Sequence, residues 1–314
     1  MLEVVVRRIC FHAYGGPEVL GLEVAPDPDP GPGELLVRTE AIGVTLPCVR
    51  AVRGEGQRQP LPGLPGGEVA GRVVAVGPLV TGFAVGDRVT APGGWYADLA
   101  PVPAVMASHI PEGAGSVEAV ALVRSGHVAF AALDTAFLSA GESVLITGAA
   151  SAVGHLALQL AKIQGAGRVV AAVGSLDKAP FLRELGADDV VSYDSGMLGG
   201  PVDVVLDAVG GDLLPRAVAA LSPGGRLIFF GSGGGSVSAF DLLTGSKTIT
   251  GMAVANFART QRSRYDEHHR QLWRLHQSGQ LRAVVHAQIP LADAATAHRI
   301  IEARTNQGKV VLRP

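Results

Sequence analysis

The sequence predicts an α/β fold in which a doubly wound parallel sheet accompanies a mostly β domain. Residues 143–230 alternate strand-like and helix-like segments, whereas the first hundred residues hold short apolar, β-branched runs separated by glycine and proline turns. Such alternation builds right-handed βαβ units, with helices on both faces of one parallel sheet. At 314 residues the chain is also long for a single core, so we expect two domains.

The N-terminal part is expected to form a small barrel or sandwich. Residues 34–38 and 70–76 are short strand candidates, and a turn at 86–90 leads into a further strand. The segment 26–33 consists of proline, aspartate and glycine, so it cannot be a helix or a central strand. The short spacing of these runs favours an all-β domain.

The alternating region follows an alanine-rich helix that is expected over residues 117–138. Its expected strands lie at 143–147, 168–173, 189–191, 202–207 and 226–230, and its expected helices at 153–164, 178–185 and 213–221. The pattern ends after about residue 255. A polar helix is then expected at 265–278, and a strand at 309–312 closes the chain.

Composition excludes several classes of function. The 26 basic and 28 acidic residues give a formal net charge of −2, so no overall field attracts nucleic acid or an anionic membrane. The two cysteines, Cys10 and Cys48, cannot supply a disulfide framework or a four-cysteine zinc site. The N-terminus lacks a signal-peptide pattern, and no uncharged apolar stretch reaches about 18 residues. We therefore expect a cytoplasmic protein that does not bind membranes or nucleic acid.

A turn of small residues, GAASAVG at 148–154, joins a strand to a helix. At such a turn a dinucleotide pyrophosphate approaches the backbone, where free N–H groups and the helix dipole favour an anion. We expect this contact at Ser151, Ala152, Val153 and Gly154. The alternative is an ordinary tight strand–helix turn, because the segment is not a strict G-x-G-x-x-G. The surrounding alternation favours a Rossmann cofactor domain.

The end of the second strand of this domain predicts which dinucleotide is bound. NAD sites usually place an acidic residue there, to hold the ribose 2′-hydroxyl. Here the strand ends in Gly174 and Ser175, and Lys178 follows. A hydroxyl and a cation suit a 2′-phosphate, so NADPH is expected rather than NADH. Alternatively, Lys178 is a solvated helix residue, and the neighbouring Asp177 weakens the case.

Several segments together carry a family resemblance. They are FHAYGGPEVL at 11–20, AIGV at 41–44, PGGEVAG at 65–71, VGDRV at 85–89, LGAD at 185–188 and PLADAATAH at 290–298. With them the chain resembles, over essentially its whole length, the quinone oxidoreductase (zeta-crystallin-like) branch of the medium-chain dehydrogenase/reductase superfamily.

The resemblance implies a GroES-like, mostly β substrate domain at 1–120 and 256–314, around an inserted Rossmann domain at 121–255. It implies that NADPH binds between them, and that homodimers form through the Rossmann edge strand at 248–252. The family's 2′-phosphate contacts carry over onto Gly174, Ser175, Lys178, Tyr193 and Arg304. The contacts to pyrophosphate and nicotinamide carry over near Val209, Gly210 and 230–232, including Gly231.

The resemblance also implies that the enzyme works without zinc. Zinc-dependent members ligate the metal through a cysteine and a histidine, whose positions are Thr45 and Gly67 here. Without thiolate and imidazole a catalytic zinc site cannot assemble. We also interpret the adjacent His268 and His269 as solvated, because neighbouring residues point to different faces of a helix.

The substrate half departs from the branch. Its N-x-x-D-x-Y pattern is Thr45-Leu46-Pro47-Cys48-Val49-Arg50 here, and a threonine usual near the nicotinamide is Val128. We expect catalytic roles for Thr45, Arg50 and His127: Arg50 to bind a carboxylate, phosphate or enolate oxygen, and His127 or Cys48 to donate a proton. Cys48 and Trp95 are expected to contact substrate. Three of these residues also have a structural alternative: Cys48 and His127 as packing residues, and Arg50 as a surface residue.

These features predict hydride transfer from NADPH to a quinone or to an activated C=C or C=O bond, as in an enone or enoyl compound. The rewritten segment 45–50 motivates an alternative, a family member that binds NADPH but has altered or lost catalysis. The near-neutral charge disfavours a third possibility, nucleic-acid binding.

Overall fold

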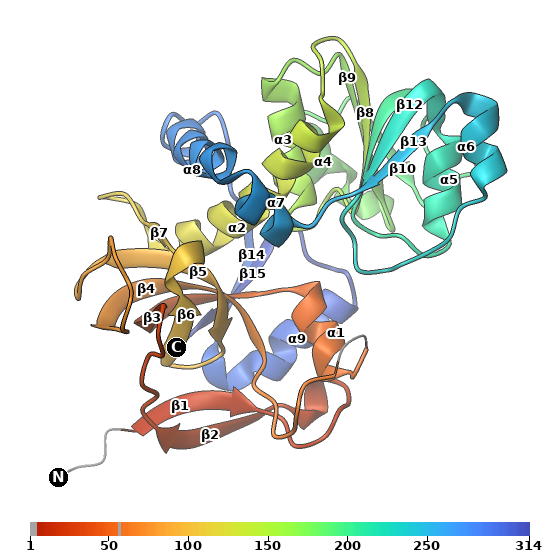
Figure 1. The fold of residues 1–314 in the computed structure, drawn as a ribbon. Helices are drawn as coiled ribbons and strands as arrows, with labels where there is room; N and C mark the ends of the chain where they lie inside the picture. The colour runs from red at the N-terminus through yellow and green to blue at the C-terminus, as the bar shows by residue number, and fades with distance from the viewer. Residues whose placement is uncertain (1–4, 56–57) are drawn as a thin grey trace. The chain divides into compact units, whose positions relative to one another are not determined.

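The computed structural model describes residues 5–55 and 58–314, which form two compact units (Figure 1). Of these described residues, the first unit contains 5–55, 58–124 and 285–314, and the second contains 125–284. The first boundary falls within helix α2 (Ser116–Ala136).

The first unit is mostly β. Its larger sheet has the order β14-β15-β3-β4-β5-β7, with β6 paired to β3, and a separate hairpin joins β1 and β2 antiparallel. The strands are β1 (Val5–Cys10), β2 (Gly21–Pro26), β3 (Glu34–Val44), β4 (Gly66–Val76), β5 (Arg88–Trp95), β6 (Leu99–Pro103), β7 (Ser108–His109), β14 (Val285–Pro290) and β15 (Lys309–Arg313). The helices are α1 (Leu46–Val52) and α9 (Ala294–Glu302), with 3-10 turns at Pro17–Val19, Ala104–Met106 and Leu291–Asp293.

The core of the first unit forms because apolar residues alternate along these strands. Leu35, Val37, Val69 and Val89 are fully buried, and they share one cluster with residues of α9 and β15. Strand β3 continues to Val44, six residues beyond its expected end at 38. Both ends of the chain contribute strands to one sheet, because β15 pairs antiparallel with β3.

The second unit is a six-stranded parallel sheet in the order β10-β9-β8-β11-β12-β13. The strands are β8 (Ser143–Thr147), β9 (Arg168–Val173), β10 (Asp189–Ser192), β11 (Val202–Asp207), β12 (Leu221–Phe229) and β13 (Thr248–Gly251). The helices are α3 (Gly154–Ile163), α4 (Ala179–Glu184), α5 (Leu213–Ala219), α6 (Ala239–Gly245), α7 (Val254–Thr260) and α8 (Arg262–Gln277), with a 3-10 turn at Leu176–Lys178.

This strand order is that of a Rossmann sheet, in which successive strands are added toward one edge up to the third and toward the other edge from the fourth, which lies beside the first. The first and fourth strands are β8 and β11 here, which pair through Val144–Ile146 and Val204–Leu206. Helices α3 and α4 lie on one face of the sheet, and α5 and α6 on the other (Figure 1). The central strands read as continuous apolar runs because both faces are covered. The predicted fold class is therefore confirmed.

The second domain boundary differs from the expected one. Residues 256–284 belong to the second unit, whereas we expected the β domain to resume at 256. Two contacts explain the difference. Leu272 of α8 packs on Gly126 of α2, where an added Cβ would lie 2.3 Å from the leucine side chain. The Gln159 side chain of α3 also donates to the Arg282 carbonyl at 3.0 Å and accepts from the Arg282 N–H at 2.8 Å.

Helix α2 is, among the described residues, the one helix long and apolar enough to cross a membrane. However, 83% of its apolar window is buried inside the protein, as in a core helix.

Candidate active site

The turn after β8 has the close backbone packing that a pyrophosphate site needs. Gly148 has φ +61°, and a Cβ on Gly154 would lie only 2.2 Å from the Gly148 carbonyl oxygen. The Ser151 hydroxyl accepts from the Gly154 N–H at 3.0 Å and so satisfies a backbone donor at the start of α3. Ser151, Ala152, Val153 and Gly154 thus form the tight entry to a helix whose N-terminal end favours an anion.

Tyr193 joins the ends of three strands of the second unit. It follows β10, its N–H donates to the Val173 carbonyl at 2.8 Å, and its hydroxyl accepts from the Gly148 N–H at 2.6 Å. A Cβ on Gly174 would lie 3.8 Å from the Tyr193 ring. The structure therefore brings together Gly174, Tyr193 and the turn at 148–154, which lie far apart in sequence.

The segment after β9 presents the remaining predicted phosphate ligands of this unit. Ser175 caps the 3-10 turn Leu176–Lys178: its hydroxyl accepts from the Asp177 N–H at 3.2 Å and donates to the Asp177 carboxylate at 2.9 Å. Gly174 and Ser175 are exposed, and Lys178 is half-buried at the end of the turn. No acidic residue stands at 174 or 175, the first two positions after the strand.

A buried polar pair, which sequence reasoning missed, builds the turn after β11. The Thr147 hydroxyl donates to the Asp207 carboxylate at 2.5 Å, and both side chains are fully buried. Asp207 also accepts from the N–H groups of Val209 and Gly210 at 3.0 and 3.2 Å. The pair fixes the two central strands at the switch point of the sheet, where such folds bind their ligands. An aspartate at the end of a buried strand was the available signal.

Gly231 lies beside this turn, because a Cβ on it would be 2.5 Å from the Ala208 carbonyl oxygen. Val209, Gly210 and Gly231 are therefore neighbours at the carboxyl ends of β11 and β12. Arg304 belongs to the first unit, where it follows α9 as an exposed residue with φ +53°. Its role as a phosphate ligand stays a prediction.

The first unit contains a pocket of about 320 Å³. Its lining includes the predicted substrate contacts Cys48 and Trp95, together with Ala51, Val52, Gln59, Leu64 and Pro65. Burial raises the pKa of the Cys48 thiol, so the pocket wall carries a neutral thiol. Among the described residues that line this pocket, there is no aspartate, glutamate, lysine, arginine or histidine.

Two of the three predicted catalytic residues have local structural contacts in the first unit. The Thr45 hydroxyl caps α1 by accepting from the Cys48 N–H at 3.3 Å. The Arg50 guanidinium donates to Glu55 at 2.8 Å. Neither residue belongs to the pocket lining.

His127 does not occupy a position suited to proton donation. It is fully buried in α2, its ring is stacked on Tyr265 of α8 with the centroids 3.8 Å apart, and neither ring nitrogen has a hydrogen-bond partner in the described chain. Burial holds its pKa well below the usual value, so the ring is neutral. The structure assigns it to helix packing instead.

The interpretation of His268 and His269 as solvated is wrong. His268 is buried, stacks on Phe130 and Phe257, and bonds to the Asp134 carboxylate at 2.8 Å. His269 is half-buried, with its ring parallel to that of His127. The two residues point to different sides of α8, but both contact α2: His268 through Phe130 and Asp134, and His269 through the ring of His127.

The position of the second missing zinc ligand has no room for a side chain. A Cβ on Gly67 would lie 2.1 Å from the Gly43 carbonyl oxygen, so a histidine there would displace the backbone of β3. With a hydroxyl at Thr45 and no side chain at Gly67, the two family ligands are absent.

Comparison with known proteins agrees with this architecture. Two family models match, the alcohol dehydrogenase GroES-like domain over residues 31–128 and the zinc-binding dehydrogenase over residues 152–272. A quinone oxidoreductase of Pseudomonas aeruginosa is 34% identical, over 98% of this chain and 99% of its own. The chain belongs to the quinone oxidoreductase family of the medium-chain dehydrogenase/reductase superfamily.

Two further similar proteins are informative, and the second of them has a solved structure. A 2-haloacrylate reductase of Burkholderia is 31% identical over 98% of the chain and 99% of its own. The structure of Escherichia coli quinone oxidoreductase complexed with NADPH has a TM-score of 0.90 and 32% identity, over 98% of this chain and all of that one. The predicted family and its two-domain fold class are thus confirmed.

Proposed function

We propose that the chain is an NADPH-dependent, zinc-independent oxidoreductase that transfers a hydride to a quinone or to an activated C=C or C=O bond. The observation that carries the proposal is the end of β9, where Gly174, Ser175 and Lys178 replace the acidic residue of an NAD site. NADPH supplies the hydride when it is bound. The protein's task is then to position the two reactants and exclude water.

The residues of the second unit fit this cofactor. The glycine-bounded turn at 148–154 holds the pyrophosphate, and the open backbone of Gly174 beside the Tyr193 ring leaves room for the ribose phosphate. Lys178 and the Ser175 hydroxyl bind the 2′-phosphate. Ser175 exchanges its bond with Asp177 for one with the phosphate, so Asp177 limits how tightly NADPH binds.

The pocket of the first unit receives the acceptor. Its volume lies at the lower end for small-molecule sites, and its walls combine apolar side chains with the polar groups of Cys48, Gln59 and the Trp95 indole. An uncharged ring or enone fits these walls better than a carboxylate or phosphate, because none of the described lining residues is a cation. Arg50 was expected to bind an anionic group, but it is paired with Glu55.

Catalysis proceeds without a catalytic zinc ion, since Thr45 and Gly67 replace the two family ligands. The negative charge that develops on the acceptor oxygen is met by hydrogen-bond donors rather than by a metal. The neutral Cys48 thiol is such a donor on the pocket wall.

The enzyme is a cytoplasmic homodimer that pairs through β13. This strand is the edge of the parallel sheet, and the neighbouring α6 exposes Phe240 and Leu243. An uncovered edge strand beside apolar side chains favours association of two copies. Phe240→Glu with Leu243→Glu should give monomers in sedimentation, whereas Leu79→Glu, at an exposed leucine of the other unit, should not.

The cofactor preference and the reaction are tested together. Calorimetry should give NADPH a Kd at least tenfold lower than NADH, and NADPH oxidation should accelerate with benzoquinones or simple enones. Equal affinities, or a preference for NADH, would remove the basis of the proposal.

The alternative of a cofactor-binding protein without catalysis is supported by the structural contacts of Thr45 and Arg50. It makes an opposite prediction: tight NADPH binding with no turnover for quinones, enones, haloacrylates or enoyl thioesters. Turnover with one of these acceptors eliminates it.

A further inference from the structure

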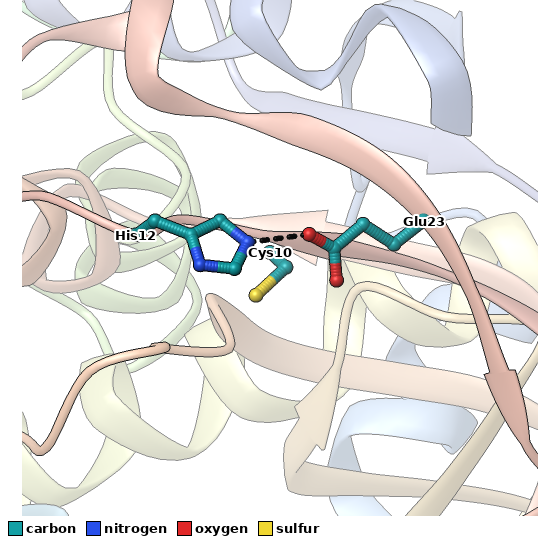
Figure 2. Close-up of side chains that lie close together, drawn as sticks. All are labelled: Cys10, His12 and Glu23. Atoms are coloured by element: carbon teal, nitrogen blue, oxygen red, sulfur yellow. Dashed lines mark hydrogen bonds and ion pairs between the residues drawn. The ribbon is translucent and has the colours of Figure 1, made fainter.

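Three metal-ligating side chains meet on one face of the β1–β2 hairpin (Figure 2). Cys10 ends β1, and His12 lies two residues further on, in the bend that follows the strand. Glu23 of β2 pairs with Arg8 and therefore shares the face of Cys10. The sulfur, imidazole and carboxylate ligand atoms all lie within 4.8 Å of one another.

We propose that Cys10, His12 and Glu23 bind a zinc-class divalent cation at a site separate from the acceptor pocket. A thiolate, an imidazole and a carboxylate are the ligand types that Zn²⁺ prefers, and three protein ligands leave a fourth position for water. None of the three lines the pocket. This site is unrelated to the family's catalytic zinc site, because Thr45 and Gly67 supply neither the thiolate nor the imidazole of that site.

The charges at the site balance when the metal binds. The Cys10 thiol loses its proton to water as the sulfur–metal bond forms, and no redox change is involved. The thiolate and the Glu23 carboxylate then offset the two charges of the cation. His12 Nε2 lies 2.6 Å from Glu23 Oε1, a hydrogen bond that gives way to two metal bonds as the imidazole binds through an unprotonated nitrogen.

The surroundings allow entry and set the affinity. The Cys10 side chain is buried with 1% exposure, whereas the His12 side chain is 70% exposed, so the metal enters from the imidazole side. Burial, and then the charge of Glu23, raise the pKa of the Cys10 thiol, which stays protonated until a metal displaces the proton. The positive charge of Arg8 disfavours cation binding, because Arg8 lies opposite Glu23 in the hairpin.

Backbone hydrogen bonds connect this cluster to the pocket wall. Phe11, which lies between Cys10 and His12, exchanges two bonds with Gly63 at 3.0 and 2.8 Å, and Leu64 and Pro65 of the pocket follow directly. The Tyr14 hydroxyl donates to the carbonyl of the lining residue Gln59.

The Gly15 N–H also donates at 3.0 Å to the carbonyl of Val52, another lining residue. Metal occupancy fixes the backbone on both sides of Phe11. It therefore also sets the position of the pocket wall.

Metal binding is tested by calorimetry with Zn²⁺ and by the sulfur-to-metal absorption band with Co²⁺, on the reduced full-length protein. We expect one equivalent to bind, the Co²⁺ band to vanish in Cys10→Ser, and affinity to fall at least tenfold in His12→Gln and Glu23→Gln. Arg8→Gln should tighten binding.

The matched control is His109→Gln, because His109 also pairs with a carboxylate, that of Asp87 at 3.2 Å, but has no thiol beside it. This variant should bind as the unchanged protein does. A lack of binding at micromolar Zn²⁺, or a Co²⁺ band that survives in Cys10→Ser, would overturn the site.

The connection to the pocket has a readout that needs no turnover. In a Trp273→Phe background, Trp95 is the remaining tryptophan, and Zn²⁺ should change its fluorescence. Fluorescence that is unaffected by bound Zn²⁺ would overturn the connection. The same metal should shift the acceptor KM at least twofold, and His12→Gln should abolish both effects. Only this KM readout rests on the proposed function, because binding and fluorescence are measured without an acceptor.

Discussion

At the scale of single residues, the cofactor turn depends on positions where a side chain does not fit. A Cβ on Gly154 or Gly231 would come within 2.5 Å of a backbone carbonyl oxygen or closer. Such contacts hold two strand ends and a helix start together, and they leave backbone N–H groups for the pyrophosphate. This part of the site was predictable from sequence, because the turn is continuous in the chain.

Lys178 is the residue whose replacement tests the cofactor. In Lys178→Ala we expect the Kd for NADPH to rise about tenfold or more, since a charge-assisted hydrogen bond to phosphate contributes roughly 1.5–3 kcal/mol. The Kd for NADH, which lacks the 2′-phosphate, should stay unchanged. Titration of both dinucleotides by calorimetry measures the two effects.

Lys162→Ala provides the control for this substitution. Lys162 lies near the end of α3 and pairs with Asp188 at 2.7 Å, just before β10, so it is at the amino ends of the strands, whereas the cofactor turn is at their carboxyl ends. It should leave both affinities unchanged. An equal loss of NADPH and NADH affinity in Lys178→Ala would indicate a structural role for that lysine.

At the scale of elements, the alternation over 143–230 predicted the parallel sheet closely, because buried parallel strands are short continuous apolar runs. Strands β8, β9 and β11 have their expected bounds. Helix α8 was found but its surroundings were misread. Its many charged residues conceal an apolar stripe at Tyr265, Leu272 and Leu275, which is buried within the second unit.

The parts of the candidate sites that sequence did not predict depend on contacts between distant segments. The Thr147–Asp207 pair spans two strands, and the Cys10, His12 and Glu23 cluster spans a hairpin whose pairing was not foreseen. A search for ligands at fixed spacing in one segment misses such a set. The pocket also forms from three separated segments, although its lining residues Cys48 and Trp95 were themselves predicted as substrate contacts.

The interface of α2 and α8 gives a test of the role of His127. In His127→Phe the ring still stacks on Tyr265, but two buried ring nitrogens without partners are removed. We expect the free energy of unfolding to rise by about 1–3 kcal/mol, because a buried polar atom without a hydrogen bond is unfavourable. Urea denaturation near neutral pH measures the change.

The same variant separates packing from catalysis. If His127 only packs, kcat and KM for the acceptor stay within about twofold of the unchanged protein. If His127 is the proton donor, its loss lowers kcat by about a hundredfold or more. His127→Ala is the comparison, since it leaves a cavity beside Tyr265 and should lower stability. A large fall in kcat for a well-folded His127→Phe would restore the catalytic assignment.

At the scale of the whole molecule, both units contain buried neutral histidines. In the second unit, His155 accepts from the Val284 N–H at 3.0 Å and its Nδ1 bonds to the Ser151 carbonyl, and burial lowers its pKa to about 4. In the first unit, His298 stands edge-on to the Tyr96 ring, and burial likewise lowers its pKa to about 4. Each ring must gain a proton on unfolding in mild acid.

Stability should therefore fall as the pH drops from about 6.5 toward 4. In that window the unfolded chain binds a proton at each of these histidines and the folded chain does not, so acid favours unfolding. At pH 5 each of the two contributes a loss of about 2 kcal/mol relative to pH 7.5. Urea denaturation at pH 7.5, 6.5, 5.5 and 5 measures how the free energy of unfolding changes with pH.

His298→Phe should reduce this pH dependence, whereas His109→Gln, at an exposed histidine, should not. An unfolding free energy that stays constant down to pH 5 would contradict neutral burial of these rings, and with it the packing that holds residue 284 on α3 beside the cofactor turn.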